Sequence, residues 1–187
     1  MNWFLLSLIA ILFWSGSDLF SKMGAKPEDT YSHWKMVMAV GVVMGLHAVF
    51  MIATGTPFSL GDIVTYLPAS FCYITSMVIG YAGLRYIELS ISSPICNASG
   101  ALVAIIAIVS GTAEKMAAAQ YIAIFLACAG VIGLGFVEAN EDDALRAARQ
   151  EASNYKYAKS WLALALPIAY CILDAAGTFA DDLVLET

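Results

Sequence analysis

Long apolar runs separated by short polar links dominate the sequence. A helix needs about 20 mostly apolar residues to cross the ~30 Å hydrocarbon core of a bilayer. Six stretches meet that length: residues 2–21, 33–53, 63–84, 89–110, 116–137 and 161–180. They are apolar nearly all round, whereas a soluble amphipathic helix would show a polar face at a period of 3.6 residues. The pattern therefore predicts an all-α integral membrane protein with six transmembrane helices.

The first five runs form one predicted unit, residues 1–137. The links between them are short, and short links make consecutive helices antiparallel neighbours. Residues 138–160 are a polar, charged linker in which acids come first and bases later. That order favours a short helix, because negative charge is stabilised near a helix N-terminus and positive charge near its C-terminus. A solvated connector on the membrane surface and a partner-binding segment both fit this composition.

The sixth run repeats features of the first. Shifting the chain by 159 positions aligns Ile9 and Ala10 with Ile168 and Ala169. A five-helix unit followed by one similar helix is the pattern of an internal repeat, and an odd number of helices inverts the second copy in the membrane. Residues 161–187 are therefore predicted to be the first helix of a truncated second, inverted repeat. A homodimer is expected if the chain is a genuine half of such a protein.

Composition and motifs narrow the class of protein. Of the 187 residues 60% are hydrophobic and only 13% are charged, which disfavours a soluble domain. The chain has no basic patch of the kind that binds nucleic acid. It also lacks the usual nucleophile, zinc and phosphate-loop motifs, so we predict no enzyme activity, no cofactor and no metal site.

The positive charges indicate an orientation. If the helices alternate in direction, eight Lys and Arg residues lie on the side of the links after runs one, three and five, against one on the other side. The positive-inside rule then places the N-terminus outside the cytoplasm. The eight are Lys22, Lys26, Lys35, Arg85, Arg146, Arg149, Lys156 and Lys159, and the one is Lys115.

The first run carries an acid and a base. Trp14, Asp18 and Lys22 are spaced four residues apart, so they share one stripe of a helix. Ionisable groups inside a membrane span are costly and commonly functional. The stripe could line a polar path for a solute, or Asp18 and Lys22 could form a salt bridge at the helix end. Asp174, deep in the sixth run with no base within four residues, is a second candidate for the site.

The fourth run contains a proline. Pro94 removes one intrahelical hydrogen bond, so we expect the helix to bend there. Ser92, Ser93 and Asn97 lie close to the bend in sequence, and they either line a polar site or accompany a packing kink. In the second run, Gly41 and Gly45 form a G-x-x-x-G pattern, which predicts a close approach between helices.

Several of these features together resemble the EamA-like branch of the drug/metabolite transporter superfamily. The first run has Trp14, then small residues, then Lys22 eight positions on, as members of that family often do. The section from the third run to the fifth resembles the family more closely. Its matching positions are Arg85, Tyr86, Pro94, Glu114, Gly130, Gly133 and Gly135. Asp18 is a departure, because the family typically has an apolar residue there.

The resemblance implies two inverted five-helix repeats around a central substrate cavity that opens to each side in turn. It also implies a cytoplasmic N-terminus, opposite to the orientation that the charges favour. We therefore expect a multi-pass protein of the inner or plasma membrane that transports a small metabolite or drug. Trp14, Asp18, Lys22, Pro94 and Asn97 would contribute to its site, with a coupled proton or cation. A membrane scaffold or assembly subunit that transports nothing is the alternative.

Overall fold

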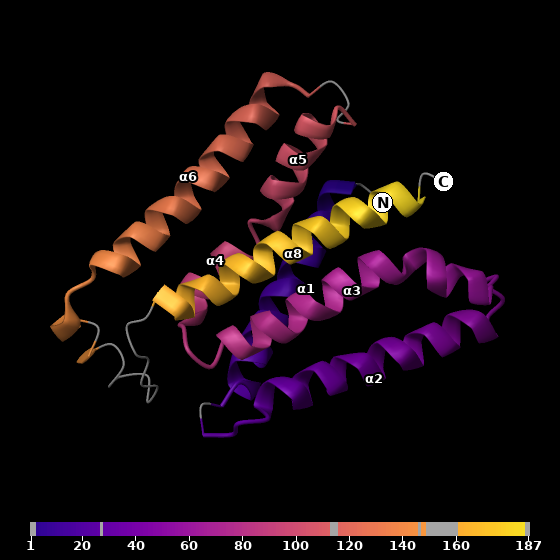
Figure 1. The fold of residues 1–187 in the computed structure, drawn as a ribbon, viewed down its shortest axis with the longest axis horizontal. Helices are drawn as coiled ribbons and strands as arrows, with labels where there is room; N and C mark the ends of the chain where they lie inside the picture. The colour runs from indigo at the N-terminus through magenta and orange to yellow at the C-terminus, as the bar shows by residue number, and fades with distance from the viewer. Residues whose placement is uncertain (1–2, 27, 113–115, 146, 149–160, 186–187) are drawn as a thin grey trace.

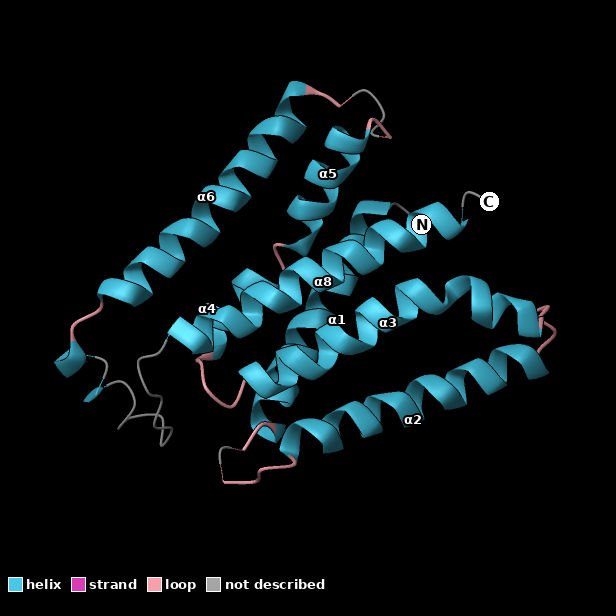
Figure 2. Ribbon diagram, viewed as in Figure 1, coloured by secondary structure: helices cyan, strands magenta, loops and turns pink. Residues whose placement is uncertain are grey.

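The computed structural model of the chain describes residues 3–26, 28–112, 116–145, 147–148 and 161–185. Within those residues every regular element is a helix (Figure 2). The helices are α1 (Trp3–Gly24), α2 (Ser32–Ala53), α3 (Leu60–Gly83), α4 (Leu89–Cys96), α5 (Ser99–Ser110), α6 (Ala118–Asn140) and α8 (Trp161–Leu185). All six predicted apolar runs are therefore helical, with ends that differ from the predicted ends by a few residues.

Five of the segments are long and apolar enough to cross a membrane. They are Phe4–Gly24, Ser32–Ala53, Leu60–Gly83, Leu89–Ser110 and Ala118–Val137. These helices indicate a multi-pass membrane protein. The sixth expected span, α8, is a helix but is not among the five, so a six-span repeat architecture stays a prediction.

The helices run back and forth between two ends of the molecule. In Figure 1 the links after α1, α3 and α6 lie toward the lower left, and those after α2 and α5 lie toward the right and the top. This is the alternation on which the charge count depends. Most of the linker at 138–160, with four of the counted basic residues, lies outside the described residues, as do Glu114 and Lys115.

The fourth run is two helices and not one. Pro94 lies inside α4, and the helix is interrupted three residues later, between Cys96 and Ser99. At the break the amide of Ala98 donates to the carbonyl of Ile95, three residues back, at 3.2 Å. This contact replaces the four-residue spacing of an α-helix with a tighter turn. The sequence predicted a bend at Pro94, and the structure instead interrupts the helix one turn after the proline.

The closest packing is between α3 and α8, which lie side by side in the middle of the molecule (Figure 1). Small residues make this possible, because a β-carbon added at Gly80 would lie 2.6 Å from Cδ2 of Tyr170. On α8, one added at Gly177 would lie 3.2 Å from Cβ of Cys72. Ala69 and Ala175 in the same helices are fully buried. The contact between α3 and α8 therefore depends on the absence of larger side chains.

A second cluster packs α4 against its neighbours. Ile87, Ile91 and Ile95 are spaced four residues apart and are all buried, together with Leu164 of α8. Val131 and Leu134 of α6 cover the same cluster. One side of α4 therefore packs against α6 and α8.

The predicted packing glycines of α2 lie in a different setting. A β-carbon added at Gly41 or Gly45 would have no atom of another element within 4 Å. Among the described residues the G-x-x-x-G pattern therefore contacts no other helix, and its role in packing stays a prediction. The close approaches occur instead at Gly24, which faces the side chain of Met36 in α2, and at Gly80, Gly83 and Gly177, none of which the sequence pattern indicated.

Candidate functional site

The centre of the site is a contact between α1 and α4. The hydroxyl of Ser93 donates a hydrogen bond to Oδ2 of Asp18. The amide Nδ2 of Asn97 lies 3.4 Å from the same oxygen. The structure thus brings together two residues predicted for the site, Asp18 and Asn97, which are 79 positions apart in the chain. Ser93, which the sequence placed only near the bend, joins them.

The end of α4 explains why these groups face α1. Ser93 and Asn97 are four residues apart, so they share a stripe of the helix that differs from the buried isoleucine stripe. The Nδ2 group of Asn97 also donates to the carbonyl oxygen of Ser93 at 2.8 Å and lies 3.0 Å from its hydroxyl oxygen. The Asn97 side chain therefore bonds back to its own helix, at a carbonyl that also accepts from the Asn97 backbone amide at 2.9 Å.

The electrostatics of this contact are those of an anion held by neutral donors. Carboxylates form strong hydrogen bonds with hydroxyl and amide donors, and such bonds stabilise an ion that has left bulk water. Both donors converge on Oδ2 of Asp18. Among the described residues, none donates a hydrogen bond to Oδ1. The two donors from α4 therefore hold one oxygen of the Asp18 carboxylate in place.

Lys22, one turn after Asp18, has different partners. Its Nζ donates to the carbonyl oxygens of Leu84 and Ile87 at 2.6 and 2.9 Å. Those carbonyls belong to the end of α3 and the link to α4, where a helix leaves acceptors unpaired and its dipole favours positive charge. The salt bridge between Asp18 and Lys22 that the spacing allowed is thus replaced by two separate contacts, and Lys22 ties α1 to the link between α3 and α4.

The other predicted site residues are more distant from this contact or play no direct part in it. Trp14 is 63% exposed, so α1 carries its side chain away from the packed helices. Pro94 lies next to Ser93 in α4 and acts through the backbone.

Asp174 lies on α8, close to the same region. Its charge and that of Asp18 both act on Tyr170 and on Cys96, which places the two carboxylates around shared neighbours. The backbone carbonyl of Asp174 accepts a hydrogen bond from the hydroxyl of Thr178 at 3.0 Å. Asp174 therefore adds negative charge near the site from a third helix.

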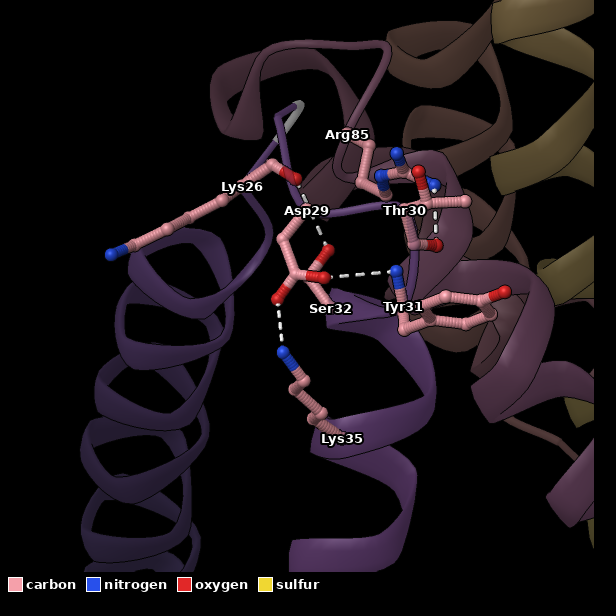
Figure 3. Close-up of polar contacts among 7 residues, drawn as sticks. All are labelled: Lys26, Asp29, Thr30, Tyr31, Ser32, Lys35 and Arg85. Carbon is pink, nitrogen blue, oxygen red and sulfur yellow. Dashed lines mark hydrogen bonds and ion pairs between the residues drawn. The ribbon is translucent and has the colours of Figure 1, made fainter.

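A polar cluster closes the link between α1 and α2 at one end of the molecule (Figure 3). Asp29 forms an ion pair with Lys35 at 2.5 Å and accepts a hydrogen bond from the backbone amide of Tyr31 at 3.0 Å. Arg85 donates to the carbonyl oxygen of Thr30 at 3.2 Å. The Lys35 ammonium and the Tyr31 amide hold the pKa of Asp29 below its ordinary value of 3.8. Arg85, which follows α3, thus connects the end of that helix to the residues just before α2.

No family model, curated protein or solved structure matches the chain. The likeness to the EamA-like transporters therefore stays a prediction based on the residues themselves. Ser93, the carbonyl oxygens that bind Lys22 and the glycines of α3 and α8 were not predicted for their roles. A signal for Ser93 did exist, because it lies four residues before Asn97 and immediately before the proline.

Proposed function

We propose that the protein is a secondary transporter of a small solute in the inner or plasma membrane, and that Asp18 is its coupling group. One observation carries the proposal: the carboxylate of Asp18 meets Ser93 and Asn97 where the fourth apolar run is interrupted. All three residues lie within candidate membrane spans.

Two physical arguments support this function. An ionisable side chain within a span is expensive, so it usually serves a solute or ion path and faces a partner. Interrupted helices with polar groups at the break are typical of the binding regions of secondary transporters. The chain combines both features in one contact. Its resemblance to the EamA-like family, with a second, inverted repeat and alternating access, is consistent with the same proposal.

Each polar residue near the contact between α1 and α4 has its own role in this proposal. Asp18 binds a proton or a cation, and Ser93 and Asn97 hold its carboxylate. Lys22 keeps the link between α3 and α4 attached to α1. Asp174 contributes negative charge from α8.

The test is proton movement that depends on a solute. The full chain is reconstituted in proteoliposomes loaded with the pH indicator pyranine, and amino acids, nucleotide sugars and ethidium are added in turn. We expect one of these classes to change the internal pH with the native chain. Asp18→Asn should abolish that change, because the amide cannot bind a proton.

Asp182→Asn is the matched control, since Asp182 is an exposed acid near the end of α8. It should retain the native response. A native response that persists in Asp18→Asn would overturn the coupling role. If no class produces any flux although the chain is folded in the vesicles, the scaffold alternative is favoured.

A further inference from the structure

The two oxygens of the Asp18 carboxylate differ in their surroundings. Oδ2 accepts from the hydroxyl of Ser93 and lies within 3.4 Å of Nδ2 of Asn97, whereas the described residues donate no hydrogen bond to Oδ1. The Ser93 contact is the closer of the two. The side chain of Asn97 also donates to the carbonyl and hydroxyl oxygens of Ser93 at the end of α4. The Ser93 hydroxyl, which also accepts from Asn97 at 3.0 Å, is therefore the closer of the two donors to Asp18.

We propose that Ser93 is a positioning residue, which holds Oδ2 of Asp18 and thereby sets how readily the carboxylate takes up a proton at Oδ1. This inference rests on the proposed function, because it concerns the loading of the coupling group. A hydroxyl that donates to a carboxylate favours the ionised form, so its removal favours the protonated form. Ser93 would act through Asp18 and would not need to touch the solute.

Other charged or titratable groups near Asp18 come from each packed helix. Lys22 follows on α1, and Tyr81 of α3 and Cys96 of α4 are within electrostatic range of the carboxylate. Tyr170 of α8 is in the same range, and Asp174 acts on the same neighbours. A change at Ser93 leaves all of these in place. A shift that follows the hydroxyl of Ser93 therefore reports on Ser93 and not on the net charge of the region.

The residue that precedes Ser93 provides a matched control. Ser92 is 2% exposed and lies on the same helix, but its Oγ contacts Sγ of Cys96 at 3.8 Å and not Asp18. Ser92→Ala and Ser93→Ala thus remove the same atom from adjacent buried or half-buried positions. Ser93→Thr keeps the hydroxyl, and Ser93→Cys replaces it with a weaker donor of similar size.

The experiment is modification of the full chain in proteoliposomes by dicyclohexylcarbodiimide, which reacts with protonated carboxyl groups in membranes. Peptide mass spectrometry measures the modified fraction of Asp18 as a function of pH. In Ser93→Ala we expect the pH of half-modification to rise by about one unit, because loss of a hydrogen bond to a charged carboxylate shifts its protonation equilibrium by about tenfold. Ser93→Cys should move it part of the way, while Ser93→Thr and Ser92→Ala should follow the native profile.

Two results would overturn the inference: Ser93→Ala and Ser93→Cys profiles that coincide with the native one, or an equal shift in Ser92→Ala. The Ser93→Cys and Ser93→Thr variants keep the test decisive if Ser93→Ala does not fold. The labelling needs no flux, so it separates the two proposals. A shift without any solute-driven flux would uphold the role of Ser93 and favour the scaffold alternative over transport. Proton-linked flux with no shift would refute the role of Ser93 alone.

Discussion

The α3–α8 contact and the outer face of α2 contain the same kind of residue in opposite situations. Gly80 and Gly177 lie where two helices touch, and an added β-carbon would meet Tyr170 at 2.6 Å or Cys72 at 3.2 Å. Gly41 and Gly45, which have the familiar G-x-x-x-G spacing, have nothing within 4 Å. A glycine in an apolar helix thus shows that close approach is allowed. Whether a close approach occurs depends on which helix the fold places beside it.

The polar contacts of the two regions differ in the same way. Near α3, Lys22 binds two backbone carbonyls in a partly buried setting and joins segments more than sixty residues apart. At the start of α2, Asp29 and Lys35 form a local ion pair whose lysine side chain is 68% exposed. Buried contacts to otherwise unpaired carbonyls contribute more to stability than exposed ion pairs do. The inner region should therefore be far more sensitive to substitution than the outer one.

The largest effect is expected from filling the glycine contact of α3. Gly80→Leu should destabilise the fold by about 3 kcal/mol, because overpacking a close contact costs about 1–3 kcal/mol and the β-carbon alone would lie 2.6 Å from Cδ2 of Tyr170. Denaturant titration followed by far-ultraviolet circular dichroism in detergent micelles measures the loss.

Gly41→Leu is the matched change on α2, where no neighbour is within 4 Å. It should change the free energy of unfolding by less than about 0.5 kcal/mol, as surface substitutions usually do. Equal losses in the two variants would contradict the comparison. A loss in Gly41→Leu that depends on protein concentration would instead indicate a second copy packed on α2.

A smaller loss is expected at the contact of Lys22. In Lys22→Met the carbonyls of Leu84 and Ile87 lose their donor, and an unsatisfied buried acceptor costs about 1–3 kcal/mol. The same titration measures it, and hydrogen exchange of residues 84–88 should increase. Lys26→Met, at an exposed position in the following link, should leave both measurements unchanged. Equal behaviour of the two variants would mean that the Lys22 contact contributes nothing.

The smallest effect belongs to the ion pair at α2, and it should depend on pH. The Lys35 ammonium lowers the pKa of Asp29 in the folded chain, so the stabilisation is present above the ordinary value of 3.8 and is lost as the pH falls through the lower, folded value. Asp29→Asn should therefore lower the melting temperature slightly at pH 6, and the difference from the native chain should shrink as the pH falls from 3.8 through the lower, folded value. A difference that grows on acidification would contradict the sign of this linkage.

Much of the fold could be predicted because helices in apolar sequence depend on local pattern. The six helical runs and the short links follow from composition, and Pro94 predicted a bend in the fourth run, which the structure interrupts one turn later. For the site, Asp18 was predicted because charge is rare in such runs, and Asn97 because it follows the bend. The assignment of Lys22 as a partner of Asp18 was open, since spacing on one helix says nothing about acceptors on another.

The sequence by itself determined where the helices lie and which residues are costly to bury, since both depend on the chemistry of single side chains and on helical periodicity. Only the tertiary structure decided the partners. In it Asp18 accepts a hydrogen bond from Ser93, and Lys22 donates to the carbonyls of Leu84 and Ile87. The close contact between helices occurs at Gly80 and Gly177. The physical reason is that these contacts join positions tens of residues apart. Their energies depend on how the helices are placed side by side, which no local pattern records.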